Sequence, residues 1–200
     1  MKQLLITMTL ILAAASAGGL RAQEVGLDFC AGMSQALDDQ GNRGPRGVNM
    51  SLDWLMYPQD RVGVGVRVAI NRWRPVPGRF SDDLQAIFDG GLGSDDAIIE
   101  IVPSMRIRSS SPGMLNFFAQ VGVGAFILSM KPKPADDLAA PHVEQPRQWI
   151  STWGFSIGPG VSLGNWKIFN VQILPLYNVV FLTDRPLRYA SINAGLMFGI

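Results

Sequence analysis

Segment 62–70 of this chain, VGVGVRVAI, alternates strictly between large apolar residues and small or charged ones. Val62 and every second residue up to Ile70 are β-branched, whereas the residues between them are glycine, alanine and Arg67. Because side chains on a strand point alternately to opposite faces, this period of two predicts a β-strand. A second face of small side chains that carries one charge is typical of a strand whose apolar face contacts lipid and whose other face points into the interior of a narrow barrel.

Seven further segments alternate in the same way, so the sequence predicts eight strands. They span residues 25–34, 47–57, 97–108, 115–128, 149–162, 167–181 and 187–200. The connections at 58–60, 109–113 and 163–165 are short, those at 35–46, 73–96 and 129–148 are long, and the last one is intermediate. We therefore expect an all-β fold, an eight-stranded antiparallel up-and-down transmembrane β-barrel with short periplasmic turns and longer extracellular loops. A hairpin hidden after Trp73 would raise the number of strands to ten.

The hairpin registers follow from the rule that opposed side chains lie on the same side of a sheet. This rule places Tyr57 opposite Arg61, Ile107 opposite Leu115 and Ile157 opposite Val171. The last strand, 187–200, is expected to pair with the first, which leaves the sheet without a free edge.

Two residue types are expected to mark strand ends or irregularities. Prolines 103, 159 and 175 lack the N–H that a sheet ladder uses, so we expect bulges or strand ends there. Tryptophans gather at the level of the lipid headgroups in membrane barrels. We expect such girdles to include Trp54, Trp73, Trp149, Trp153 and Trp166, although Trp73 and Trp166 do not fall cleanly on the apolar face.

The second face of the predicted strands carries nearly all of their polar residues. Charges in a narrow bore are costly unless they are paired, and both signs occur here in similar number. We therefore expect a hydrogen-bonded and ion-paired filling of the bore; the alternative is a gated pore or a proton path. The residues are Asp28, Asp53, Arg67, Glu100 and Arg106, with Asn49, Gln120, Asn170, Gln172, Asn178 and Asn193.

The first 22 residues have the layout of a secretory signal peptide, with Lys2, an apolar run and small residues before a predicted cleavage after Ala22. Residues 23–200 would then form the barrel domain. No later segment has about 18 consecutive apolar residues, so the rest of the chain would cross a membrane only as a closed barrel. The formal net charge of +1 favours no nucleic acid partner, and Cys30, the single cysteine, has no partner for an internal disulfide.

Residues that carry chemistry are sparse. His142, the only histidine, lies two residues before Glu144 in the proline-flanked segment PHVEQP, and no serine is near it in sequence. One histidine and one distant cysteine do not supply a metal site. Closely spaced glycines, such as Gly63 and Gly65, lie within strands rather than at helix starts, so they do not form a phosphate-binding loop. We predict no catalytic residues, no cofactor and no metal.

The alternating strands, the apolar leader and the closing strand SINAGLMFGI resemble the outer membrane protein β-barrel domain family and its OmpX- and OmpA-like relatives. One difference is that such barrels usually end in an aromatic residue, whereas Gly199 and Ile200 follow Phe198 here. The resemblance implies residence in the outer membrane of a Gram-negative cell as a monomer. It also implies contact with outer-membrane lipid, including lipopolysaccharide, and with the barrel-assembly machinery during insertion.

The sequence favours a structural or surface-interaction role without catalysis, and two other classes of function stay open. The first is a lipid-modifying enzyme of the lipid A deacylase kind, which would use His142. The second is a soluble lipocalin-like carrier, which predicts an apolar interior. The long loops carry mixed charges, as in Arg79 with Asp82 and Lys131 with Asp136, and can serve a surface partner that the sequence does not specify.

Overall fold

The computed structural model describes residues 24–37, 43–59, 61–73, 97–109, 114–130, 148–165, 168–183 and 186–199. The predicted signal peptide and the long segments 74–96 and 131–147 lie outside the described residues. Within the part described, no helix is long and apolar enough to cross a membrane.

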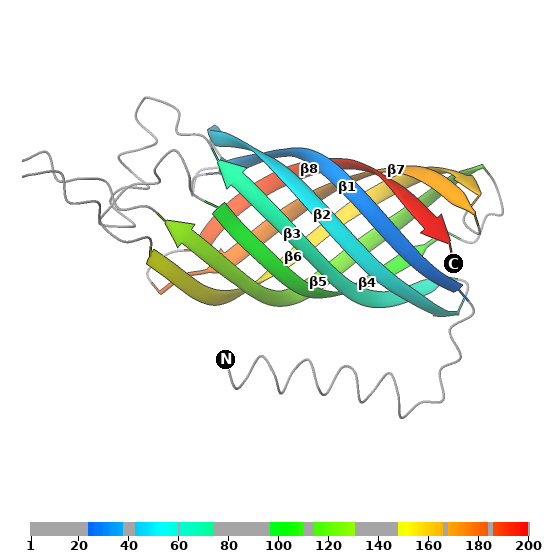
Figure 1. Cartoon of the computed structure of the whole chain (residues 1–200), viewed down its shortest axis with the longest axis horizontal. Coiled ribbons are helices and arrows are strands. Elements are labelled where there is room, and N and C mark those ends of the chain that lie inside the picture. Colours follow the sequence, from blue (N-terminus) through cyan, green and yellow to red (C-terminus); the bar gives the residue numbers. More distant parts are fainter. Residues whose placement is uncertain are drawn as a thin grey trace, which may run out of the picture.

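Eight strands form one closed sheet in which every neighbouring pair is antiparallel (Figure 1). β3 pairs directly with β4, so no further hairpin is inserted between them and the ten-stranded alternative is wrong. The predicted all-β fold, an eight-stranded antiparallel up-and-down barrel, is confirmed. The strands are β1 (Glu24–Leu37), β2 (Arg43–Gln59), β3 (Val62–Trp73), β4 (Ala97–Arg108), β5 (Leu115–Met130), β6 (Gln148–Asn165), β7 (Phe169–Phe181) and β8 (Pro186–Gly199).

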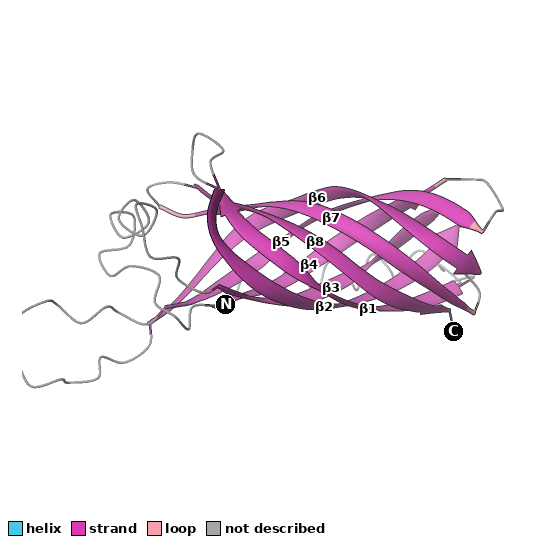
Figure 2. Cartoon of the chain, turned by 90° about the horizontal axis from the view of Figure 1, so that it is seen from above, coloured by secondary structure: helices cyan, strands magenta, loops and turns pink. Residues whose placement is uncertain are grey.

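The strands are inclined to the barrel axis (Figure 2). A path across directly paired residues leaves β1 at Gly26 and returns to it at Ala36, ten residues further along the strand. In an eight-stranded barrel, strands with such an offset are tilted by roughly 35–45° to the axis, and the bore is narrow enough for side chains to fill it. The intermediate residues of the path are Leu55, Gly65, Ser104, Gly122, Ser156, Asn178 and Tyr189.

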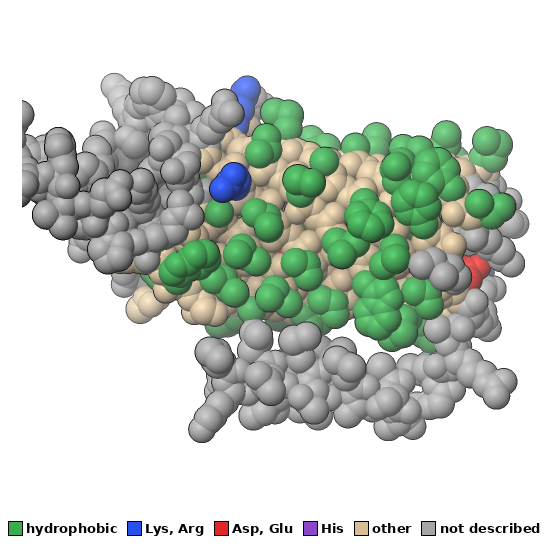
Figure 3. Space-filling model, viewed as in Figure 1, with side chains coloured by type: hydrophobic (Ala, Val, Ile, Leu, Met, Phe, Trp, Pro, Cys, Tyr) green, Lys and Arg blue, Asp and Glu red, His purple; other side chains and the backbone are tan. Residues whose placement is uncertain are grey.

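The apolar faces of the strands point outward, as predicted. Val68, Val123 and Ile157 are 42%, 57% and 49% exposed, whereas Asp53 and Arg106 inside the barrel are completely buried. Figure 3 shows apolar side chains covering the wall, with charged ones only near its two ends. A water-soluble β-protein buries its large aliphatic residues, so this surface is the inverse of a soluble one.

The predicted hairpin registers are wrong, although the assignment of residues to faces is right. Ile107 lies opposite Ala119 rather than Leu115, and Ile157 lies opposite Tyr177 rather than Val171. In the β2–β3 hairpin Met56 lies opposite Val64, and a register shift between Met56 and Gln59 accommodates the turn. The predicted pairs are displaced by two residues in β2–β3, four in β4–β5 and six in β6–β7. A pattern of period two is unchanged by an even displacement, so alternation alone does not detect such errors.

Two further expectations about the strands are corrected. Leu37 pairs with Arg43, so the first loop is shorter than the predicted segment 35–46. The prolines stand within continuous strands, and no register shift occurs at any of them. Pro103 keeps its pairing with Val66 on β3, whereas the β4–β5 ladder is interrupted at Pro103. The β6–β7 ladder is likewise interrupted where Pro159 faces Pro175. A proline removes one donor, which faces one neighbouring strand, so the other ladder is unaffected.

The aromatic residues only partly follow the predicted girdles. Trp54, Trp149 and Trp153 point outward and are 43%, 58% and 59% exposed, and Trp153 stacks on Phe181 with ring centroids 4.1 Å apart. Trp73 is buried in the bore against Tyr189, because β3 continues past Ile70 and its alternation turns residue 73 inward. Trp166 lies outside the described residues.

Two small corrections concern residues assigned to the outer face. Ala125 is only 3% exposed, since it is a short side chain directly opposite Trp153. Val179 is 7% exposed and lies between the buried residues Asn178 and Val180 near the end of β7. The rest of the alternation in β5 and β7 is as expected.

Glycines let large side chains lie flat against the inner wall. A Cβ atom built on Gly160 would lie 2.2 Å from Cζ of Phe118, whose ring also lies under the guanidinium of Arg106, 4.5 Å from ring centroid to Cζ. The ring thus lies close to both Gly160 and Arg106, which limits its room to retreat. Gly160 is therefore a position where the absence of a side chain is required by packing.

We predict that Gly160→Ala lowers the free energy of unfolding by about 1–3 kcal/mol, because the methyl group must displace Phe118. The second substitution Phe118→Leu should remove most of this loss when it is added to Gly160→Ala. Urea titration of the folded fraction in phospholipid vesicles measures both. Additive losses in the double variant would contradict the proposed contact.

Candidate functional site in the barrel lumen

The lumen is filled by side chains that change in character along its length. We call the end of the barrel where β3 ends and β4 begins the loop end, and the end where β1 begins and β8 ends the short-turn end. An apolar cluster lies in the bore at the loop end, and smaller apolar clusters lie toward the short-turn end and in the middle. Charged and amide side chains occupy the space between these clusters. The loop-end cluster comprises Trp73, Ile98, Val102, Phe126, Leu128, Val180, Leu187 and Tyr189; the others comprise Leu55, Tyr57 and Met197, and Phe118, Leu174 and Leu176.

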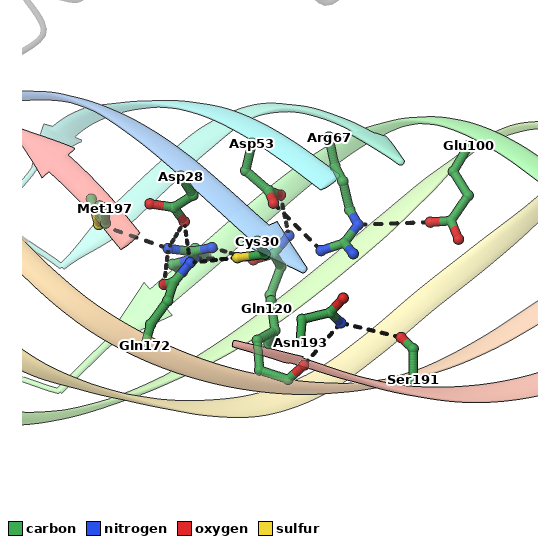
Figure 4. A network of polar contacts seen from close by, with 12 residues as sticks. Asp28, Cys30, Asp53, Arg67, Glu100, Gln120, Gln172, Ser191, Asn193 and Met197 are labelled. Carbon is green, nitrogen blue, oxygen red and sulfur yellow. Dashed lines mark hydrogen bonds and ion pairs between the residues drawn. The ribbon is translucent and has the colours of Figure 1, made fainter. Parts of the chain in front are cut away.

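Arg106, from β4, is the centre of the polar filling. Figure 4 labels three of its partners, Asp28, Gln120 and Gln172, inside the barrel. Nη1 of Arg106 lies 2.6 Å from Oδ2 of Asp28, and Nε and Nη2 donate to Oε1 of Gln120 at 3.0 and 2.7 Å. Nη1 also donates to Oε1 of Gln172 at 3.2 Å. The partners come from β1, β5 and β7, so this single guanidinium ties together strands that are not neighbours in the sheet.

A second charged group continues the network toward the loop end. Arg67 Nη1 lies 3.4 Å from Oδ2 of Asp53, and Arg67 Nε lies 3.7 Å from Oε2 of Glu100. Gln120 donates to Oδ1 of Asp53 at 2.8 Å and so joins the two arginines. The hydroxyl of Tyr189 and the amide of Asn71 donate to Oε1 of Glu100. Each charge in the middle of the bore therefore has an opposite charge beside it.

A fourth ion pair among the described residues lies at the short-turn end. Nη2 of Arg108 donates to Oε2 of Glu24 at 2.8 Å, and the Arg108 guanidinium lies 4.2 Å from the ring centroid of Tyr57. Glu24 is 22% exposed, so this pair is in contact with solvent, unlike those of Arg67 and Arg106.

Shorter polar side chains line the wall beside the network. Asn193 donates to the carbonyl of Leu174 at 3.0 Å, whereas Asn49, Asn178 and Ser156 have no hydrogen-bond partner among the described residues. In proteins, ordered water commonly satisfies such buried groups. The central part of the bore is polar, which is the opposite of a lipocalin-like pocket and contradicts that alternative.

The lumen confirms the predicted set of inward polar residues. Asp28, Asp53, Arg67, Glu100 and Arg106 are all buried, and the structure joins them through Gln120 and Gln172. The roles of Tyr189 with Glu100 and of Arg108 with Glu24 were not foreseen. Extending the alternation of β8 back from Ser191 would have placed Tyr189 inside, but its contact with β4 depends on the closed barrel.

Two features of the described side chains in the bore bear on catalysis and metal binding. Cys30 is buried and accepts a contact from Nε2 of Gln172 at 3.3 Å. Among the residues that the structure describes, no group of three or more His, Cys, Asp or Glu residues is arranged to hold a metal ion. His142, Glu144 and the charged residues of the two long loops lie outside the described residues.

We predict that Arg106→Met lowers the free energy of unfolding by about 3–5 kcal/mol, because it leaves Asp28 buried without its counter-ion. The double variant Arg106→Met with Asp28→Leu should regain most of the loss. Arg108→Met is the matched control, since its partner Glu24 reaches solvent, and it should cost about 1 kcal/mol. Equal losses for both single variants, measured by urea titration in vesicles, would contradict the central role of Arg106.

Comparison with known proteins relates the barrel to solved structures. No protein-family model matches the sequence, and no curated protein matches it at significant similarity. The crystal structure of Neisserial surface protein A (NspA) aligns with a TM-score of 0.61 at 11% identity, over 87% of this chain and 96% of that chain.

Two other solved structures align over most of their length. Ail, the attachment invasion locus protein of Yersinia pestis, has a TM-score of 0.51 at 14% identity over 88% of this chain and 98% of its own. A major outer membrane protein from Thermus thermophilus has a TM-score of 0.52 at 10% identity over 88% and 99%. At such identities the similarity is one of fold. The chain is thus a small eight-stranded β-barrel that shares its fold with these solved structures.

Proposed function

We propose that this protein spans the outer membrane of a Gram-negative cell as a closed, non-catalytic barrel that serves a structural or surface-interaction role. Residues 1–22 would direct its export as a signal peptide. The proposal rests on one combined observation: the outer wall is apolar, and ion-paired side chains extend across the bore.

The outer wall supports membrane residence. The outward residues of its middle part are aliphatic or aromatic, and the sheet has no free edge because β1 pairs with β8 from Gly26 to Leu37. In the hydrocarbon core no water is present to satisfy an open edge, so a sheet can span it only as a closed barrel. The same apolar wall in water would be an extensive surface for aggregation.

The lumen supports a closed barrel rather than a pore. Arg106 bonds to residues of β1, β5 and β7, and the loop-end apolar cluster lies between this network and the loops. Ions would have to break buried pairs and then cross an apolar layer. We infer that the wild-type barrel carries no steady current.

The connections support a role at the surface. The two longest, 74–96 and 131–147, join strands at the same end of the barrel, opposite to the end where β1 begins and β8 ends (Figure 1). Loops on a rigid scaffold commonly carry function. The names of NspA and Ail refer to surface location and attachment, and we propose a comparable surface role here, with a partner still to be identified.

The first test is conductance in planar bilayers together with electrophoresis of unheated and boiled samples. The folded protein should migrate differently before boiling and should give no steady channel. The comparison is the double variant Arg106→Ala with Phe126→Ala. It removes one side chain from the polar network and one from the loop-end apolar cluster, so current can appear in it. Steady channels in the wild type would contradict the closed barrel.

The second test uses the depth dependence of charge in the wall. Val123→Arg should lower the free energy of unfolding in vesicles by about 2–4 kcal/mol, because it places a cation in the hydrocarbon region. Met114→Arg, just before β5 at the short-turn end and 75% exposed, is the matched control and should cost about 0–1 kcal/mol. Equal small effects would indicate that the wall faces water.

A further inference from the structure

The buried charges in the middle of the bore do not sum to zero. They are three carboxylates and two guanidinium groups, each at most 2% exposed, and belong to Asp28, Asp53, Glu100, Arg67 and Arg106. Three negative and two positive charges leave one negative charge in surplus. Because a buried ion without a counter-ion is strongly destabilising, the folded barrel needs one further positive charge near this network.

The rest of the described part does not supply that charge. Arg108 is paired with Glu24, so these two residues add no net charge. The remaining arginines of the described part lie on the outer face, or at or just before the ends of strands. At the loop end, the apolar cluster lies between the network and the long loops. The missing charge is therefore to be sought among ligands rather than among these side chains.

Glu100 is the least neutralised of the three carboxylates. Oδ2 of Asp28 lies 2.6 Å from Nη1 of Arg106, and Oδ2 of Asp53 lies 3.4 Å from Nη1 of Arg67. Oε2 of Glu100 lies 3.7 Å from Nε of the same Arg67 and has no hydrogen-bond partner among the described residues. Among the residues drawn in Figure 4, Glu100 is linked only to Arg67. The surplus charge is therefore centred on Oε2 of Glu100.

Three buried asparagines lie in one row beside Glu100. Asn71 on β3 is directly opposite Asn49 on β2, Asn49 is opposite Gly32 on β1, and Gly32 is opposite Asn193 on β8. The three asparagine side chains are at most 3% exposed. Nδ2 of Asn71 donates to Oε1 of Glu100, so the row is in contact with the carboxylate. We call Asn49, Asn71 and Asn193 the asparagine row.

The amide oxygens of the asparagine row receive no hydrogen bond. None of the three Oδ1 atoms has a hydrogen-bond partner among the described residues. A Cβ atom built on Gly32 would lie 2.8 Å from Oδ1 of Asn49, so this oxygen lies over β1, between Asn49 and Asn193. Directly opposed residues have Cβ atoms about 4.5–5.5 Å apart, which brings Asn49 close to Asn71. Together with Oε2 of Glu100, four neighbouring buried oxygens are thus without a donor.

We propose that Glu100 and the asparagine row bind one monovalent metal cation, sodium or potassium. Carboxylate and amide oxygens are the ligands that hard cations take in proteins, where they replace the hydration shell of the ion. The charge count selects a monovalent ion, since a divalent ion would turn one surplus negative charge into one surplus positive charge. The ligand set has no histidine or cysteine, so spacing along the sequence does not reveal it. This inference goes beyond the proposed function and concerns the bore alone.

The test is urea titration of the full barrel in zwitterionic phospholipid vesicles, with sodium or potassium chloride exchanged for choline chloride at constant ionic strength. If unfolding releases one cation, the unfolding equilibrium constant should fall about tenfold for each tenfold rise in metal cation above its Kd. Choline, which is far larger than a bare alkali ion, should not replace it. An unfolding constant that is equal in all three salts would overturn the inference.

Two variants test the ligands. Glu100→Gln removes the surplus charge and should make the unfolding constant independent of the cation. Asn49→Leu removes one amide oxygen and should weaken cation binding at least about tenfold. The matched controls are Glu24→Gln, whose carboxylate is 22% exposed, and Asn170→Leu, a buried asparagine opposite Met197 whose amide atoms also lack partners. Both controls should keep the cation dependence of the wild type.

Electrophoresis of unheated samples shows which variants fold, and Glu100→Gln alone decides if Asn49→Leu does not. Cation dependence that persists in Glu100→Gln, or is lost in both controls, would overturn the inference. Stability that ignores both metal ions but rises on acidification from about pH 8 to about pH 6 would also overturn it. That result would identify a proton as the missing charge, since a carboxyl that is protonated only in the folded state stabilises the barrel as the pH falls.

Discussion

The closure of β1 onto β8 is the constraint on which the rest of the structure depends. The two strands pair from Gly26 with Gly199 to Leu37 with Arg188, so every strand has two neighbours. A sheet without an edge satisfies its backbone internally and can therefore present a wholly apolar surface to a medium without water. Closure also fixes the ten-residue offset around the barrel, and with it the narrow bore that the inward side chains must fill.

The narrow bore explains why its charges are arranged as they are. Arg106 on β4 can reach Asp28 on β1 and Gln172 on β7, across the bore, only because the bore is narrow. Inside, each charge must be paired, since an unpaired buried ion costs several kcal/mol. The network thus specifies which strands face each other across the bore, and one apolar cluster lies between it and the loop end.

The outer surface differs around the barrel as well as along it. At the loop end one side carries Arg46, Arg72 and Arg188 above aliphatic residues, and the other carries Trp149, Trp153 and Phe181. Both arrangements suit the boundary between hydrocarbon and headgroups, one through charge and one through amphipathic rings.

The sequence by itself determined which face each residue occupies, because alternation is a local property of one strand. It placed Asp28, Arg67 and Arg106 inside and Val68 and Val123 outside without any knowledge of pairing. Only the tertiary structure decided the registers, since displacement by an even number of residues preserves every face, as for Ile157 with Tyr177. The network is likewise tertiary, because Arg106 on β4 meets Asp28 on β1 only when the sheet closes.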